Sequence, residues 1–315
     1  MNKKKTALIS TAALSVLSVG ALSIIGNYFY NLSLNPKTSK DVIFGNSEES
    51  TGGEIVNETL IWLLNKSNYS TVYIESFDKL RLHGYKILNE NPTDNWVITV
   101  HGYTCKGIEM SSYAKNFYDM GYNVLIPDLR GHGESEGKYI GMGWHDRLDI
   151  LSWIDLIIKN NSNAKIILHG VSMGAATVSM ASGEDLPKNV KAIIADCGYT
   201  SVWNQFSHQL KTIYSLPNFP IMNASSITTK LKTGYSLREA STLKQVSKSK
   251  TPILVSHGDK DDFVPSHMMD ELYNAANCEK EKLTIVGAGH AKSSKVNPDL
   301  YWSTIENFIN KHLVE

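Results

Sequence analysis

The chain is poor in cysteine and carries no net charge, and both features narrow the classes of protein to which it can belong. Its 315 residues include three cysteines, and its formal net charge at pH 7 is zero. Cys105, Cys197 and Cys278 provide neither a disulfide framework nor a zinc-ligand spacing. Without a basic stripe, the sequence excludes nucleic acid as an expected partner. It also lacks a His-Glu-x-x-His pair, a Walker loop and a dinucleotide fingerprint, so it indicates neither a metal nor a cofactor.

Residues 1–36 are typical of a membrane anchor. Lys3–Lys5 precede an uncharged run whose apolar part, Ala7–Ile25, approaches the length of a membrane-spanning helix. The lysines are expected to stay in the cytoplasm, which places the following domain outside. The Tyr-Phe-Tyr triplet at 28–30 resembles an interfacial aromatic anchor. Because no clear Ala-x-Ala follows, we expect a retained single-pass anchor at the cell membrane, with a cleaved signal peptide and a secreted domain as the alternative.

Strands and helices alternate along most of the remaining chain. The polar segment Asn35–Gly53 is typical of a linker, and Glu54–Leu64 has the spacing of a packing helix. Ser70–Ser76 and Leu80–Leu88 predict a β-hairpin. Further strands are expected at Trp96–Val100, Tyr122–Ile126, Lys165–Leu168, Val190–Ala195, Ile253–Ser256 and Lys282–Val286, with helices at Ile108–Met120, Trp144–Lys159, Pro265–Ala276 and Asp299–Leu313. This order predicts a mostly parallel sheet covered on both faces, with ligands beyond the carboxyl ends of its strands.

The sharpest local signal is a Gly-x-Ser-x-Gly at residues 170–174. It follows an apolar strand and opens a helix of small residues, which is the context required of a nucleophile elbow. A residue at the apex of such a turn has a strained backbone, and its neighbours two positions away have little room, which favours glycine. We therefore take Ser172 as the candidate nucleophile. The alternative is a solvated serine in a glycine-rich turn.

A serine hydroxyl needs a base, and the base needs a carboxylate to fix its tautomer. In elbow proteins these partners follow the serine in the order acid, then histidine. His290 lies in a glycine loop just after the last predicted strand and is the expected general base. The other histidines after Ser172 lie in the long insertion, ahead of the candidate acids, within a helix or near the chain end: His208, His257, His267 and His312.

The carboxylate is expected from the loop at residues 258–265. The spacing Gly-x-x-Asp-x-x-Val-Pro selects Asp261 and leaves Asp259 and Asp262 as solvated or turn-forming neighbours. Asp196, at the end of its own strand, is the alternative acid.

Two backbone N–H groups are candidates for holding a developing oxyanion. The N–H of Met173 is the first on the elbow helix. The second is expected from the loop after the Trp96–Val100 strand, at Tyr103, where Gly102 permits the turn.

Five motifs together resemble the serine α/β-hydrolase superfamily, and within it bacterial, often membrane-anchored cell-surface hydrolases and serine aminopeptidase-like esterases. They are His101-Gly102-Tyr103, residues 128–135 (Asp-Leu-Arg-Gly-His-Gly-Glu-Ser), residues 170–174, the Asp261 loop and Gly289-His290. The resemblance covers roughly residues 71–313. It implies an α/β fold with an eight-stranded sheet, one early strand antiparallel, a small helical cap after the sixth strand, and a Ser172–Asp261–His290 triad.

The expected organisation is an anchor at 1–36, a linker and packing helix at 37–69, and a hydrolase domain at 70–315 with its cap at about 198–249. The insertion could instead be a helical excursion at the sheet edge. Cys105 and Cys197 follow strands two spacings apart, about 10 Å, too far for a disulfide.

We expect a hydrolase that cleaves a small-molecule ester or a lipid through an acyl-enzyme. A peptidase acting on short peptides and a catalytically silent binding module are the alternatives, since the family does not fix the substrate.

Overall fold

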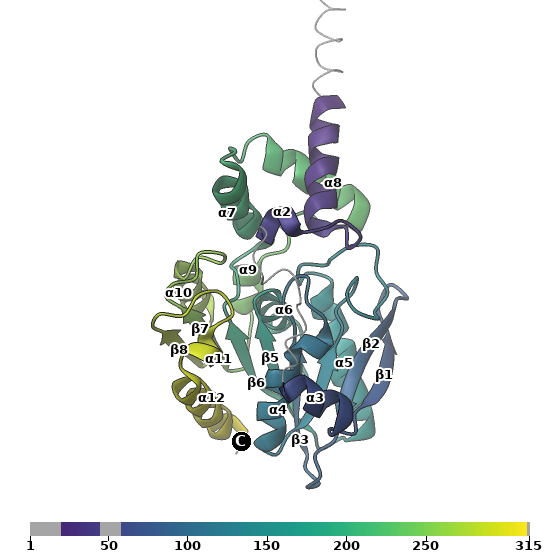
Figure 1. Ribbon diagram of the computed structural model, residues 1–315, viewed down its shortest axis with the longest axis vertical. Helices are drawn as coiled ribbons and strands as arrows, with labels where there is room; N and C mark the ends of the chain where they lie inside the picture. The colour runs from purple at the N-terminus through teal and green to yellow at the C-terminus, as the bar shows by residue number, and fades with distance from the viewer. Residues whose placement is uncertain (1–19, 45–57, 314–315) are drawn as a thin grey trace, which may run out of the picture.

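An eight-stranded sheet forms the centre of the computed structural model, which describes residues 20–44 and 58–313 (Figure 1). The strand order is β1-β2-β4-β3-β5-β6-β7-β8. Only β2 runs antiparallel to both of its neighbours, and all other pairs are parallel. The predicted α/β-hydrolase sheet with one early antiparallel strand is thus confirmed. The strands are β1 (Ser70–Glu75), β2 (Arg81–Ile87), β3 (Asn95–Val100), β4 (Asn123–Pro127), β5 (Lys165–Val171), β6 (Val190–Asp196), β7 (Ile253–Gly258) and β8 (Lys280–Ile285).

The central strands are apolar because both faces of the sheet are covered. Side chains alternate between two separate cores, so that in β3 Ile98 joins one and Val97 the other. Helices α5 (Asp146–Asn160), α6 (Met173–Ala181) and α10 (His267–Ala275) contribute to the first core. The second core holds side chains of α3 (Glu58–Asn65), α4 (Ser111–Asp119) and α12 (Pro298–Leu313). The remaining short helices outside the insertion are α2 (Asp41–Phe44), η1 (Gly107–Met110) and α11 (Ser293–Val296).

The long insertion after β6 is helical, as its sequence predicted. Helices α7 (Val202–Tyr214) and α8 (Ile221–Thr233) lie at one end of the molecule, beyond the sheet (Figure 1). Helix α9 (Thr242–Val246) departs from the expected cap, because it packs against α6 and α10 on one face of the sheet. Its buried Val246 belongs to the same core as α6.

The N-terminal segment is more closely joined to the domain than an independent anchor would be. Residues 20–34 form a helix beside α8, where a Cβ on Gly26 would meet the carbonyl oxygen of Ala224 at 2.7 Å (Figure 1). Leu34 is fully buried, and its carbonyl accepts the N–H of Ile140 at 2.8 Å. Tyr30, expected at a membrane surface, is buried against the domain, so that expectation is wrong for this residue.

Most of the predicted anchor, Ala7–Ile25, lies outside the described residues. Among the helices of residues 20–44 and 58–313, none is both long enough and apolar enough to cross a membrane. The predicted linker is partly helical at α2, and residues 45–57 are likewise outside the described part.

Candidate active site

Ser172 occupies a sharp turn between β5 and α6. Its backbone has φ 57° and ψ −116°, a conformation that costs energy in a residue with a side chain. The flanking glycines are needed for close packing: a Cβ on Gly174 would collide with the carbonyl of Val100, and one on Gly170 with the backbone of Gly174. The turn thus places the Ser172 hydroxyl at the carboxyl edge of the sheet.

The structure brings Ser172, His290 and Asp261 into one hydrogen-bonded chain. The Nε2 atom of His290 lies 2.8 Å from the Oγ of Ser172, and its Nδ1 lies 2.7 Å from the Oδ2 of Asp261. His290 follows β8, and Asp261 follows β7, so neighbouring parallel strands deliver both groups to the edge where β5 delivers the serine.

The carboxylate of Asp261 is held on both oxygens. Its Oδ1 accepts the backbone N–H groups of Phe263 and Val264, at 3.0 and 2.8 Å. Its Oδ2 also lies 3.0 Å from the Nε2 of His257, which donates to the carbonyl of Val264 at 2.9 Å as well. Sequence reasoning set His257 aside because of its place in the chain order. The signal that could have found it is its spacing, four residues before Asp261 across a tight loop.

These contacts fix protonation states. Because a carboxylate only accepts, the Nδ1 of His290 must carry the proton, which leaves Nε2 free to accept from the Ser172 hydroxyl. Burial acts to raise the pKa of Asp261, but the hydrogen bonds from His257 and His290 outweigh it and lower that pKa to about 2. Asp261 is therefore ionised over the whole neutral and mildly acidic range.

The loop after β3 lies directly beside the serine. A Cβ on Gly102 would stand 3.5 Å from the Cβ of Ser172. His101 fixes this loop: its Nε2 accepts the N–H of Leu129 at 3.0 Å, so its Nδ1 donates to the carbonyl of Gly102 at 2.8 Å. Complete burial lowers the pKa of His101 to about 4, which keeps the ring neutral. Tyr103 thus follows a rigid turn next to Ser172, and Met173 begins α6 on the other side.

The other candidates from the sequence have different partners. Asp196 accepts a hydrogen bond from Ser293 at 3.1 Å. Asp259 accepts the backbone N–H of Gly287 at 2.6 Å and so joins the Asp261 loop to the loop of His290, as a turn-forming role implies. Asp262 is exposed.

The remaining histidines make no hydrogen bond to the chain of Ser172, His290 and Asp261, which we call the relay. The exposed His267 sits 3.7 Å from Glu271, and His312 lies 3.8 Å from Glu279. The Nε2 of His208 lies 3.0 Å from the carbonyl oxygen of Asp262.

Cys105, Cys197 and Cys278 all carry free thiols, and Cys197 is the one that lies near Asp261 and His290. The sulfur of Cys197 and one ligand atom each of Asp261 and His290 lie within 4.8 Å of one another. Three such groups could hold a metal ion, but two of them already bond to each other. Burial also raises the pKa of Cys197 well above its usual value and disfavours the thiolate that a metal needs. We assign no metal to this site.

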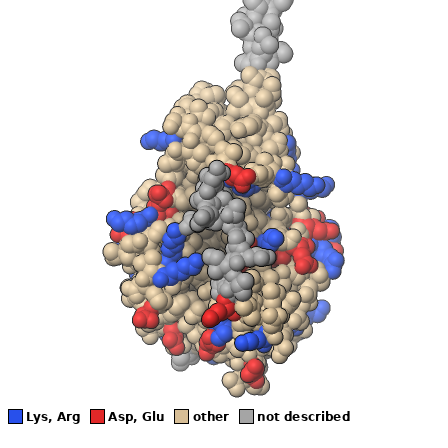
Figure 2. Space-filling view, in the orientation of Figure 1, with Lys and Arg blue, Asp and Glu red and all other residues tan. Residues whose placement is uncertain are grey.

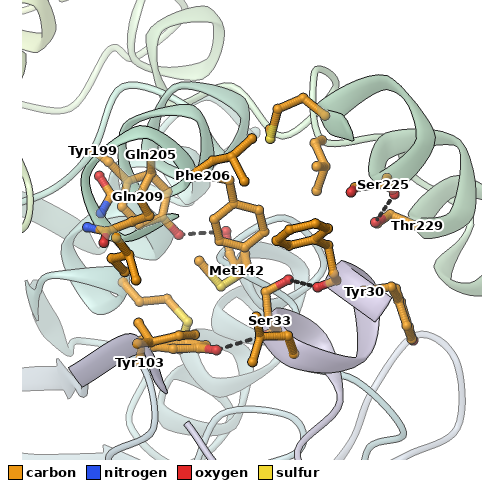
Figure 3. A pocket seen from close by; sticks show the side chains of 18 of the residues that line it. Tyr30, Ser33, Tyr103, Met142, Tyr199, Gln205, Phe206, Gln209, Ser225 and Thr229 are labelled. Atoms are coloured by element: carbon orange, nitrogen blue, oxygen red, sulfur yellow. Dashed lines mark hydrogen bonds between the residues drawn. The ribbon is translucent and has the colours of Figure 1, made fainter. Parts of the chain in front are cut away.

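Ser172 is one of the residues that line a mainly apolar pocket. Figure 3 shows this pocket between Tyr103, Tyr199 and Tyr30. Its empty volume, the open mouth included, is about 830 Å³. Tyr103, Ser172 and Met173 are among the lining residues, and α7, α8 and the helix at 20–34 supply most of the rest. The pocket therefore leads from the candidate nucleophile into the space below the cap.

The chain is similar to known proteins in sequence and in fold. The family model for serine aminopeptidase S33 matches residues 91–217. The chain belongs to the serine α/β-hydrolase superfamily. Its strand order and the sharp turn at Ser172 agree with that membership.

Among its relatives, YqkD of Bacillus subtilis (strain 168) is 30% identical over 308 residues, which cover 97% of each chain. The lysophosphatidylserine lipase ABHD12 of Rattus norvegicus is 29% identical over 163 residues, 50% of this chain and 38% of that protein. A solved structure, the Pyrococcus furiosus esterase Pf2001, superposes with a TM-score of 0.62 at 25% identity, covering 78% of this chain and 91% of the esterase.

Proposed function

We propose that this hydrolase cleaves carboxylic esters through an acyl-enzyme. The Ser172 oxygen attacks the ester carbonyl carbon while its proton passes to the Nε2 of His290. The N–H groups of Met173 and Tyr103 stabilise the oxyanion that forms. The ester C–O bond then breaks, and the leaving alkoxide takes the proton from His290. Water repeats the sequence, giving the carboxylic acid and free enzyme, while ionised Asp261 keeps the imidazole oriented throughout.

The observation that carries this proposal is the relay itself. Its two hydrogen bonds, of 2.8 and 2.7 Å, join three side chains that lie up to 118 residues apart in the chain. They leave the proton of His290 on the nitrogen that the mechanism requires. A silent binding module has no need of such an arrangement, and this favours an enzyme over that alternative.

The pocket favours an ester over a peptide substrate. An aminopeptidase needs an acidic side chain near the nucleophile to hold the substrate ammonium group. Within the part of the chain that the structure describes, no Asp or Glu lines the pocket beside Ser172. An apolar pocket suits the acyl group of an ester or lipid, and the names of two relatives, an esterase and a lipase, are consistent with it.

The test compares ester and amide turnover in the full chain, purified in detergent. A fluorophosphonate probe should label the wild type and fail to label Ser172→Ala. p-Nitrophenyl esters should be hydrolysed far faster than aminoacyl p-nitroanilides. Faster turnover of the anilides would replace the esterase with a peptidase, and an intact chain that never labels would leave a binding module.

We also propose that the N-terminal run tethers the domain to the outer face of the cell membrane. Lys3–Lys5 followed by the uncharged run to Pro36 supports this arrangement. The part of the insertion that holds α7 and α8, residues 198–240, supports it too, with four basic side chains (Lys211, Lys230, Lys232, Arg238) against one acidic, Glu239. Fractionation of cells that express the full chain tests the tether: recovery of a shortened chain in the medium would indicate cleavage instead.

A further inference from the structure

The helix at residues 20–34 contributes directly to the pocket. Phe29, Tyr30, Leu32 and Ser33 line it together with Ser172. In Figure 3, Tyr30 and Ser33 lie across the pocket from Tyr199 and Gln209. The segment that the sequence assigned to an anchor thus forms one side of the space next to the nucleophile.

Hydrogen bonds fix the C-terminal end of this helix to the hydrolase domain. The hydroxyl of Tyr103 donates to the carbonyl of Ser33 at 2.6 Å. The ammonium of Lys40 donates to the carbonyls of Leu32 and Asn35, at 2.7 and 2.8 Å, and so caps the last turn. Because the backbone N–H of Tyr103 is also a proposed oxyanion donor, this hydrogen bond fixes the helix in position relative to the loop that carries the donor.

Side-chain packing fixes the same helix to the cap. The ring of Phe29 meets that of Tyr214 edge to face, with centroids 5.8 Å apart. The ammonium of Lys232 lies 4.4 Å from the ring centroid of Tyr30. Gly26 allows the backbone of α8 to approach closely. A helix held on both sides in this way is a fixed wall of the pocket.

Most polar groups around the pocket are bonded to the protein and are unavailable to a ligand. Four of these side chains donate to backbone carbonyl oxygens. The hydroxyl of Ser225 donates to Ile221 at 2.9 Å and that of Thr229 to Ser225 at 2.8 Å, while the amide of Gln209 donates to Phe263 at 2.7 Å and the hydroxyl of Tyr199 to Met142 at 3.0 Å. Among the fully buried side-chain oxygens and nitrogens of the described residues that line the pocket, the Oε1 of Gln205 and the hydroxyl of Tyr214 have no hydrogen-bond partner. The pocket therefore presents a mainly apolar surface, which suits a hydrocarbon chain.

We propose that residues 20–34 form one wall of the acyl-binding pocket and that Phe29 limits the length of the acyl chain that fits. The inference rests on the proposed serine ester chemistry and names the substrate class as esters of extended fatty acyl chains. Ser33 is bonded to Tyr103 beside Ser172, and Phe29 lies one helical turn before Ser33, in contact with Tyr214 of α7. We therefore place the end of an acyl chain bound at Ser172 near Phe29. A smaller side chain there opens room for further methylenes, and a larger one removes it.

The test uses the full chain in detergent and a series of alkyl fluorophosphonates that differ only in chain length. Their rates of reaction with Ser172 report on the pocket, and p-nitrophenyl esters from butyrate to palmitate provide a second readout. Each further methylene that the pocket buries adds about 0.8 kcal/mol of binding free energy, which corresponds to about a fourfold higher rate. Phe29→Ala should move the preferred chain length upward, and Phe29→Trp should move it downward. Ile24→Ala, on the same helix but 72% exposed and outside the pocket, is the matched control and should leave the profile unchanged.

Opposite shifts for the two Phe29 variants cannot arise from a general loss of stability, which would lower all rates together. Identical profiles for wild type and both variants, or a uniform loss at all lengths, would overturn the inference. A wild type that reacts with the fluorophosphonates but hydrolyses no ester would overturn the proposed function alone, because the reaction rates would still report on the wall.

Discussion

Asp261 is the residue on which the proposed relay depends most. One of its carboxylate oxygens faces His290 and His257, and the other accepts two backbone N–H groups. No other acidic side chain among the described residues makes a hydrogen bond to His290. The orientation and tautomer of the imidazole therefore follow from this single carboxylate.

Asp261→Asn should abolish most of the activity while the fold persists. The amide is nearly isosteric, but its N–H₂ group can donate to the Nδ1 of His290 and favour the tautomer that holds the proton on Nε2. The expected loss of kcat is about 10⁴-fold. Steady-state hydrolysis of a p-nitrophenyl ester measures it, and circular dichroism checks the fold. A loss of less than about tenfold would show that another group orients His290.

The depressed pKa of Asp261 also predicts a change of stability in acid. Its pKa is about 2 in the folded chain and near 3.9 when unfolded, so the ionised carboxylate stabilises the fold above pH 4. This contribution, about 2 kcal/mol, is lost as the pH falls from 4 through 2. The difference in unfolding free energy between wild type and Asp261→Asn should therefore shrink by that amount between pH 5 and pH 2. Urea titrations at each pH measure it, and a constant difference would contradict the assignment.

At the level of elements, the contact between helix 20–34 and α8 depends on Gly26. A Cβ there would meet Ala224 and Thr228, whereas a Cβ on Gly20 meets nothing within 4 Å. Both Gly→Ala changes raise helix propensity by about 1 kcal/mol, so their difference isolates the packing. Gly26→Ala should lower the melting temperature and weaken the preference for long acyl chains, and Gly20→Ala should do neither. Equal effects of the two substitutions would show that the contact is not important.

The sequence was sufficient for the sheet because its signals are local. Each central strand is a short apolar run, and each site residue follows a strand end, so parallel pairing alone brings Ser172 and His290 to one edge. His257 was missed because its role depends on the turn of the loop to Asp261, which chain order does not encode. The wall formed by helix 20–34 was missed for a different reason: an apolar, aromatic stretch has the same composition whether it faces lipid or packs against a cap.

Considered as a whole, the molecule has an asymmetric surface. Large apolar side chains are exposed on the cap at Leu216, Phe219, Ile227 and Leu231, the last two of them on α8. The end formed by the cap and helix 20–34 is mostly uncharged in the view of Figure 2. Residues 198–240, which hold α7 and α8, also carry four basic side chains against one acidic, a net excess of three in a chain of zero net charge. An apolar surface with a basic excess suits an anionic lipid bilayer, which is where the proposed tether would hold this end.

This surface predicts that turnover of a membrane-embedded ester depends on the cap. With a long-chain ester in vesicles, the double variant Phe219→Ser/Leu231→Ser should lose about tenfold in rate, the effect of about 1.4 kcal/mol of apolar contact with lipid. Hydrolysis of a soluble short-chain ester should be unchanged, because neither side chain lines the pocket. Leu88→Ser is the matched control: Leu88 is also exposed, but it follows the antiparallel strand β2, at the opposite edge of the sheet from the cap.

Wild-type turnover should also fall as phosphatidylcholine replaces anionic lipid, since the basic side chains of the cap then lose their oppositely charged partners. A double variant that changes the sedimentation of the protein but not vesicle turnover would instead identify the apolar surface as a contact between copies of the chain.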